Sequence, residues 1–192
     1  MKKLLLSALI ASSISVSAFA AETYHIDPVH TNVLLKANHI GFSNVYLKVH
    51  DINGEFVFDR LNPEKSSVNV TMKAKSIDGF DETFNEHLHG VDFFNVEAFP
   101  KITFVSDEIT VTGDNTATIL GDLTIKGLSQ PTLLNVTFNK EGENPFAKDY
   151  RAGFSGTGVV KRSEYGINTA LPAVADEVGI VLEIEGIRKG KE

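Results

Sequence analysis

Apolar and polar residues alternate along much of this chain, which is the pattern of extended strands that each have one buried face. The alternation is unbroken over residues 68–75, 101–104 and 134–139. Less regular alternation predicts further strands over residues 32–38, 46–50, 54–58, 108–112, 117–125, 151–162 and 178–187. Because helical periodicity is scarce, the fold class is predicted to be all-β.

The connections between these strands carry turn chemistry. Residues 113–115 (Gly-Asp-Asn) and 126–131 (Lys-Gly-Leu-Ser-Gln-Pro) each separate two strands and predict antiparallel hairpins, and the polar segment 141–148 predicts a loop. The one helix is expected over residues 81–89, followed by an aromatic turn at 91–94. Roughly eight to ten strands with short connections indicate either a sandwich or a closed barrel.

The N-terminal segment has the pattern of a cleavable secretory signal. Lys2 and Lys3 precede a mostly apolar stretch, and the small residues Ala18 and Ala20 flank Phe19 at the positions that a signal peptidase reads. Residues 1–20 are therefore predicted to be a signal peptide, and residues 21–192 a single domain. The apolar stretch is short and interrupted by serines, so a retained membrane anchor is not favoured, and we expect the mature protein to be unanchored.

Composition narrows the possible partners. The chain has no cysteine, so it has neither a disulfide nor a lipidated cysteine at the predicted cleavage point. Removal of residues 1–20 takes away two lysines and no acidic residue, which changes the formal charge from −7 to −9. This charge disfavours nucleic acids and anionic membrane surfaces as partners.

Candidate catalytic groups are few. Ser155 lies in Gly153-Phe154-Ser155-Gly156-Thr157, which begins like a nucleophile elbow, but it ends in threonine and lies within a predicted strand. A strand position is therefore favoured for Ser155. The acidic pairs are expected to contribute solubility, since no partner base or metal is evident; these pairs are Asp176 with Glu177 and Glu183 with Glu185.

Six histidines raise the question of a metal site. His87 and His89 are two residues apart on a predicted helix, where such side chains point in different directions. No specific metal site is predicted, and His39 and His87 are expected instead to hold the ends of loops by hydrogen bonds. No cofactor is expected to be required.

Aromatic residues are the most abundant unexplained feature. Residues 21–192 contain twelve phenylalanines and four tyrosines but no tryptophan. Many phenylalanines fall on alternating strand positions, which fits a filled core. A barrel of about eight strands is also near the size at which one small ligand fits inside, and periodicity alone leaves both alternatives open.

Short segments distributed over nearly the whole chain after residue 20 are similar, in order and spacing, to those of the YceI-like family. They are His30-Thr31; His39-Ile40-Gly41-Phe42-Ser43; Gly54-Glu55-Phe56-Val57-Phe58-Asp59; His87-Leu88; Asp92-Phe93-Phe94-Asn95; Phe99-Pro100 with Ile102-Thr103-Phe104; Gly121-Asp122-Leu123-Thr124-Ile125-Lys126-Gly127 with Pro131; Arg162-Ser163-Glu164-Tyr165-Gly166-Ile167; and Asp176-Glu177-Val178. One departure is Phe84-Asn85, where the family commonly has Arg-Asp, so a head-group or loop-anchoring role of that arginine does not carry over.

The resemblance implies a lipocalin-like, extended antiparallel β-barrel of about eight strands with one short helix and an apolar tunnel. It further implies a periplasmic carrier that binds a long isoprenoid, quinone-like or other amphiphilic lipid without catalysis. Apolar strand positions near the family segments are the predicted ligand-binding residues: Val33, Leu35, Phe42, Phe56, Phe58, Val70, Met72, Phe93, Phe94, Phe104, Leu123, Phe138, Phe154 and Ile184.

Two other functions stay open at this point. One is an enzyme that acts on a lipid or quinone with His39, His87 or His89 as acid or base. The other is a structural or stress protein whose barrel is filled by its own side chains. Exposed strand edges, which pair readily with a second chain, make a homodimer an additional expectation.

Overall fold

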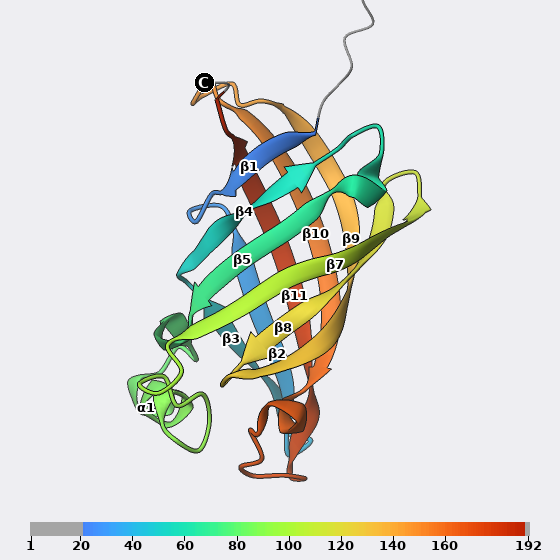
Figure 1. The fold of residues 1–192 in the computed structure, drawn as a ribbon. Coiled ribbons are helices and arrows are strands. Elements are labelled where there is room, and N and C mark those ends of the chain that lie inside the picture. The colour runs from blue at the N-terminus through green and yellow to red at the C-terminus, as the bar shows by residue number, and fades with distance from the viewer. Residues whose placement is uncertain (1–20, 191–192) are drawn as a thin grey trace, which may run out of the picture.

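The computed structural model describes residues 21–190, so the predicted signal peptide lies outside the described residues. The described residues form an all-β fold (Figure 1), with one short α-helix and three short 3-10 helices among them. The strands are β1 (Glu22–Ile26), β2 (Asn32–His39), β3 (Ser43–Val49), β4 (Ile52–Phe58), β5 (Ser67–Lys73), β6 (Ile77–Asp78), β7 (Lys101–Gly113), β8 (Thr116–Ile125), β9 (Leu128–Glu143), β10 (Tyr150–Lys161) and β11 (Val174–Arg188). The helices are η1 (Pro63–Lys65), η2 (Ala74–Ser76), α1 (Glu82–His89) and η3 (Arg162–Tyr165).

Eight antiparallel strands close into a barrel, as predicted. They follow the order β1-β4-β5-β7-β8-β9-β10-β11, and β11 pairs with β1 to complete the ring. Long hairpins form most of the wall, because β7 to β11 are each 10 to 16 residues long. Closure pairs the strand edges that would otherwise be exposed.

The lower end of the barrel in Figure 1 is extended by a second group of elements. β2 pairs with the first part of β11, and β3 and β6 continue the sheet from β2. α1 follows β6, and its N-cap residue is Asp81, whose carboxylate accepts a hydrogen bond from the Phe84 amide. The helix therefore forms where the sequence predicts it, and it buries Leu88.

β7 is one continuous strand, although the sequence predicts two. Its pairing with β8 shifts register between Ser106 and Glu108, which marks a β-bulge. Before the bulge, Ile102 and Phe104 are buried, and after it Ile109 is buried, so the inward positions change from even to odd numbers. The extra residue interrupts the alternation, and this interruption makes one strand resemble two in the sequence.

β9 is also longer than predicted. It begins at Leu128, directly after Lys126 and Gly127, which both have positive φ angles, so the turn is shorter than the predicted 126–131 connection. Pro131 lies within β9 at a point where only β8 pairs with it, since pairing with β10 starts at Leu134. Proline has no N–H group to donate, and at this position no strand on the β10 side requires a hydrogen bond from residue 131. At the other end, β9 continues to Glu143, and the loop predicted over 141–148 covers 144–149.

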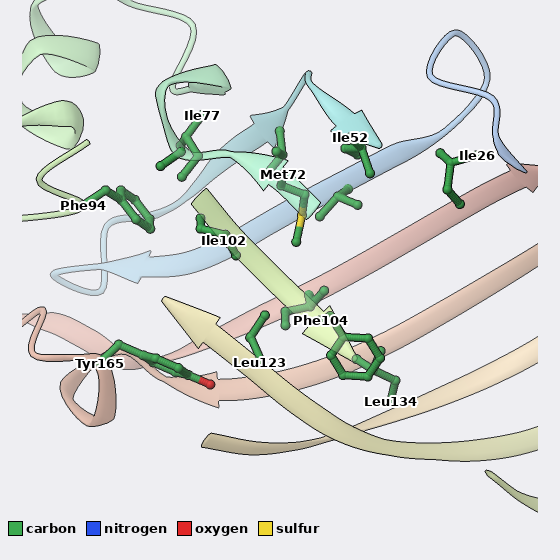
Figure 2. Close-up of a cluster of buried hydrophobic side chains, with 14 of the residues drawn as sticks. Ile26, Ile52, Met72, Ile77, Phe94, Ile102, Phe104, Leu123, Leu134 and Tyr165 are labelled. Atoms are coloured by element: carbon green, nitrogen blue, oxygen red, sulfur yellow. The ribbon is translucent and has the colours of Figure 1, made fainter. Parts of the chain in front are cut away.

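The buried apolar residues gather inside the barrel and at its lower end. Figure 2 shows Ile26, Met72, Phe104 and Leu123 directed to the interior from four different strands. Ile77, Leu88 and Phe94 close the lower end near α1. Among the described residues, no helix is long and apolar enough to cross a membrane.

Candidate functional site

An apolar cavity with a volume of about 340 Å³ runs through the interior of the barrel. Most of its lining residues are the inward positions of the strands, which recur at every second residue. On β9 these positions are Leu134, Val136 and Phe138, and on β11 they include Ile180 and Leu182. The two-residue periodicity thus determines which side chains reach the cavity.

The cavity extends nearly the full height of the barrel. On β7 its wall runs from Ile102 to Gly113. A strand rises about 3.3 Å per residue and tilts about 40° in such barrels, so the cavity is roughly 28 Å long. A cavity of this length and volume is narrow and matches the shape of one extended chain.

The two ends of the cavity differ in exposure. Near the upper end in Figure 1 its wall includes the exposed β7–β8 hairpin, with Asp114 and Asn115, and Arg60 of the β4–β5 connection. At the lower end the lining residues Phe94, Tyr165 and Ile167 are buried. The cavity therefore opens between the β4–β5 connection and the β7–β8 hairpin, and we call this opening the mouth.

The closed end contains buried polar groups that bind one another or the backbone. Arg162, 7% exposed, donates hydrogen bonds to the carbonyl oxygens of four residues, Ile167, Thr169, Val174 and Ala175. Burial lowers the pKa of its guanidinium, and the Asp176 carboxylate partly offsets that effect. Arg162 thereby holds together the segment that closes the barrel.

Most of the predicted ligand-binding residues line this cavity. Of the fourteen, twelve do so: Val33, Leu35, Phe56, Phe58, Val70, Met72, Phe94, Phe104, Leu123, Phe138, Phe154 and Ile184. The other two predicted residues, Phe42 and Phe93, do not line the cavity. Phe42 lies in the β2–β3 turn and is 88% exposed. Phe93 packs against the buried cluster, while its neighbour Phe94 reaches the cavity. Contact of the twelve with a ligand stays a prediction.

Comparison with known proteins places this architecture in a family. The model of the YceI-like domain matches residues 24–186, which is most of the chain. The chain belongs to the YceI-like family. The UPF0312 protein of Ectopseudomonas mendocina is 38% identical over 192 residues, which cover 98% of this chain and all of that protein.

Solved structures of similar proteins share the YceI-like barrel. BcnA of Burkholderia cenocepacia has a TM-score of 0.76 and 26% sequence identity, over 83% of this chain and 98% of that one. A polyisoprenoid binding domain from Saccharophagus degradans, implicated in plant cell wall breakdown, has a TM-score of 0.64 over 86% of this chain and 98% of that one. At 10% identity, the second likeness shows the fold alone.

Several cavity residues of this YceI-like chain were not predicted. Ile109 and Val111 follow the β7 bulge, so their inward direction is hidden in the sequence. Ile180 and Leu182 lie on the same alternating face of β11 as Ile184, and extending that pattern would have found them. Arg60, Asp114 and Asn115 reach the mouth only because strands far apart in sequence meet there.

Phe84 and Asn85, which stand where the YceI-like family commonly has Arg-Asp, have a local structural role in this chain. Asn85 accepts a hydrogen bond from the Gly79 amide at 2.7 Å and donates one to Asp78 at 2.8 Å. The Phe84 ring packs directly over Gly79. In this chain, Phe84 and Asn85 therefore fix α1 to the end of β6.

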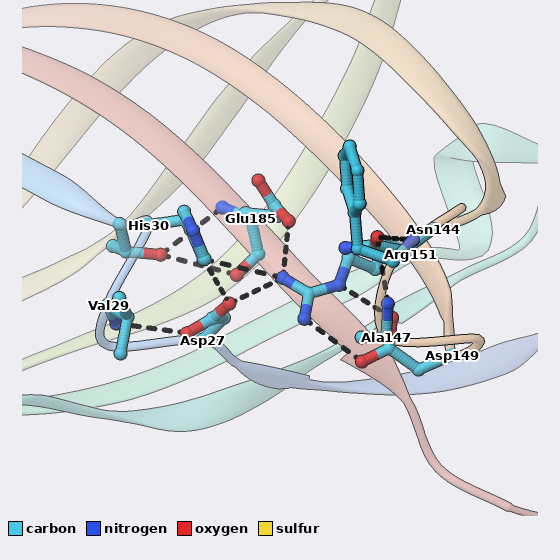
Figure 3. Close-up of polar contacts among 10 residues, drawn as sticks. Asp27, Val29, His30, Asn144, Ala147, Asp149, Arg151 and Glu185 are labelled. Atoms are coloured by element: carbon cyan, nitrogen blue, oxygen red, sulfur yellow. Dashed lines mark hydrogen bonds and ion pairs between the residues drawn. The ribbon is translucent and has the colours of Figure 1, made fainter.

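A network of charged residues lies outside the cavity lining. Figure 3 shows Arg151 of β10 in its centre, with Nη1 at 2.5 Å from Asp27 and from Glu185, and Nε at 2.7 Å from Asp149. His30 Nδ1 lies 2.7 Å from the Asp27 carboxylate. We call these five residues the Arg151 network. It joins the ends of β1, β10 and β11.

The Arg151 network is built around a guanidinium. The oxygen and nitrogen atoms of Asp27, His30 and Glu185 are close enough together to hold a metal ion. Nη1 of Arg151, however, already contacts both carboxylates, so the position of a cation is filled. Burial opposes ionisation of Asp27, but hydrogen bonds from His30, the Val29 amide and Arg151 together lower its pKa.

The histidines considered as acids or bases lie away from the cavity. Of the described residues, no histidine lines it. His39 and His87 are exposed, and His89 Nε2 donates a hydrogen bond to the Ile77 carbonyl oxygen at 2.8 Å. Ser155 lies on β10 as predicted, where its hydroxyl donates to Glu183 at 2.6 Å. These positions bring no acid, base or nucleophile of this group to the cavity.

Proposed function

We propose that this protein is a non-catalytic carrier that holds a long-chain lipid, such as an isoprenoid or a quinone-like amphiphile, inside the barrel. The observation that carries the proposal is the apolar cavity, which is open at the mouth and closed near α1. Membership of the YceI-like family and the barrel shared with a polyisoprenoid binding domain support it.

The length of the cavity favours a long chain. The hydrocarbon core of a bilayer is about 30 Å thick, and two acyl chains placed end to end span it. A cavity roughly 28 Å long thus has room for a chain longer than one acyl chain. Each methylene moved from water into apolar surroundings contributes about 0.8 kcal/mol, so some twenty carbons supply on the order of 10 kcal/mol before ordering costs.

A carrier needs no chemistry of its own, and the cavity wall fits that role. Its strands present aliphatic and aromatic side chains, which select by length and shape more than by hydrogen bonds. The hypothesis of an enzyme using His39, His87 or His89 is therefore the weaker one, since these side chains lie outside the cavity. The cavity also favours a carrier over a structural protein with a filled barrel.

The predicted signal peptide supports a periplasmic location for this carrier. Residues 1–20 combine a basic start, an apolar stretch and small residues at a cleavage site. A protein between two membranes can shield a water-insoluble molecule while it crosses the aqueous space. Intact mass spectrometry of the protein in an osmotic-shock fraction tests this location. A chain beginning at Ala21 is expected there, and a chain that keeps residues 1–20 in the cytoplasm would refute it.

Filling the cavity tests the binding site directly. Val136 points into the cavity from β9, so Val136→Trp places a large ring in the path of a bound chain. The neighbouring Asn135 is exposed, and Asn135→Trp adds the same ring outside the barrel as a matched control. Binding is measured by displacement of the neutral fluorophore N-phenyl-1-naphthylamine with geranylgeraniol.

We expect Val136→Trp to weaken geranylgeraniol binding by at least about tenfold, since the ring removes much of the apolar contact surface. Asn135→Trp is expected to bind like the unchanged protein. Urea unfolding of both variants checks that the barrel is intact. Equal affinities for two folded variants would show that the chain is not bound in the cavity.

A further inference from the structure

Of the described residues that line the cavity at the mouth, one is cationic, Arg60. Arg60 lies near the start of the β4–β5 connection, and its side chain is about 50% exposed. Its guanidinium carbon lies 4.7 Å from the centre of the Phe138 ring, so the flat group is held against an aromatic surface of the cavity wall. This stacking positions the guanidinium while leaving its edge open.

The hydrogen-bonding capacity of Arg60 is largely unused. Among residues 21–190, the structure records one ionic contact for it, between Nη1 and Glu141 Oε1 at 3.3 Å. A guanidinium has five N–H donors in a planar fork that matches the oxygens of a carboxylate or phosphate. Arg60 therefore offers most of its donors to a group that sits at the mouth.

The other arginine that lines the cavity, Arg162, already has hydrogen-bond partners. Arg162 lies at the closed end, and four backbone carbonyl oxygens accept its hydrogen bonds. A ligand that placed an anionic group there would have to displace these contacts and open the closing segment. The two ends thus favour one orientation, with the apolar chain at the closed end and the polar group at the mouth.

We propose that Arg60 binds the oxyanion head, a carboxylate or a phosphate, of an amphiphile whose chain occupies the cavity. The inference rests on the proposed function and adds a class of head group and an orientation to it. Glu141, which pairs with Arg60, and Asp114, which lines the mouth, both oppose an anion. Glu141 also competes for Arg60, so its removal strengthens the site.

Three ligands with the same prenyl chain separate the head group from the chain: geranylgeranyl phosphate, geranylgeranoic acid and geranylgeraniol. Their affinities are measured by displacement of N-phenyl-1-naphthylamine. We expect Arg60→Gln to weaken binding of the phosphate, the acid or both about tenfold, since charge-assisted hydrogen bonds are lost. The alcohol is expected to change by less than about twofold, because its chain contacts are unaffected.

Two further variants control for indirect effects. Glu141→Gln is expected to strengthen binding of the oxyanion about threefold, a gain that a damaged barrel cannot produce. Arg188→Gln is the matched control, since Arg188 stacks on Tyr150 at 3.9 Å and pairs with Glu22 at 3.1 Å but does not line the cavity. It is expected to leave all three affinities unchanged.

The outcomes separate this proposal from the proposed function. If Arg60→Gln loses affinity for the phosphate alone, or for the acid alone, the result supports the Arg60 site and identifies the head group. Equal affinities of Arg60→Gln and the unchanged protein for all three ligands would refute the Arg60 site but leave the carrier intact. Failure of the unchanged protein to bind any of the three ligands would count against the carrier itself.

Discussion

Single residues on the inner face of the barrel determine whether the cavity stays open. Gly186 of β11 lies at an inward position, and a Cβ atom there would come within 2.4 Å of the Phe56 ring. The edge of the Phe56 ring lies against this glycine, and the ring stacks on Tyr24 with the ring centres 5.0 Å apart. The same ring also meets the Phe154 ring of β10 edge to face, with the ring centres 5.4 Å apart, and both rings line the cavity.

Gly186→Ala tests this packing. The added methyl group must push the Phe56 ring away from the wall, and such overpacking costs about 1–3 kcal/mol. We expect a lower free energy of unfolding in urea, together with weaker binding of geranylgeraniol. The control is Gly179→Ala on the same strand, where the nearest atoms are 3.8 Å from the added Cβ. Indistinguishable stabilities of the two variants would contradict this account of Phe56.

The polar residues of the site show the limit of prediction at this scale. Leu134, Val136 and Phe138 follow one alternating pattern, so their common inward face is readable from the sequence. Arg60 gives no such signal, because it becomes a mouth residue only when the β4–β5 connection meets β9 across the barrel. The apolar wall was thus predictable, and its polar end was not.

At the scale of elements, local pattern predicts strands well until a strand becomes irregular. The helix at Glu82–His89 and strands such as β2 and β8 lie where alternation and capping residues indicate. The bulge in β7 reverses the inward parity, and this reversal explains why its two halves resemble separate strands. Pro131 misleads in another way. It predicts a turn, but it lies in β9 where that strand pairs on one side only.

The pairing of strands that are distant in sequence follows from closure of the barrel, and the local residue pattern does not predict it. β1 was not predicted as a strand, yet it lies between β4 and β11 and completes the ring. The sheet ends at the two-residue strand β6, and beyond it part of β3 keeps a free edge among the described strands. A homodimer through such an edge stays a prediction.

At the scale of the whole molecule, the Arg151 network holds the closure of the barrel. Arg151 is 14% exposed and connects Asp27, at the end of β1, with Glu185 on β11. Its removal leaves the largely buried Asp27 carboxylate without its cation, and broken pairs of this kind cost about 3–5 kcal/mol. The network therefore contributes to the stability of the closed barrel, and its residues do not line the cavity.

Arg151→Met is accordingly expected to lower the free energy of unfolding by about 3 kcal/mol at neutral pH. Arg188→Met, which removes a more exposed ion pair, is expected to cost less than about 1 kcal/mol. Urea titrations of both variants measure the difference. Equal losses would show that the Arg151 network has no special role in closure.

The network also predicts how stability depends on pH. Hydrogen bonds and ion pairs overcome burial and lower the pKa of Asp27, while the Asp149 pKa is lowered chiefly by Arg151. A carboxyl group with a lowered pKa stabilises the fold above its unfolded pKa, near 4, and this contribution is lost as the pH falls through the folded value. The difference between the unchanged protein and Arg151→Met should therefore shrink below about pH 4. A constant difference from pH 7 down to pH 2 would contradict this explanation.

The barrel is proposed to carry a lipid in its native compartment, and identifying the molecule that it holds there tests this proposal directly. The protein is purified from the osmotic-shock fraction of its own host without detergent, extracted with organic solvent and analysed by mass spectrometry. Val136→Trp, prepared in the same way, shows which extracted molecules require the cavity. We expect the extract of the unchanged protein to contain a long-chain amphiphile and the extract of Val136→Trp to lack it. Repeated recovery of unchanged protein without any lipid, or of the same lipid from both proteins, would contradict it.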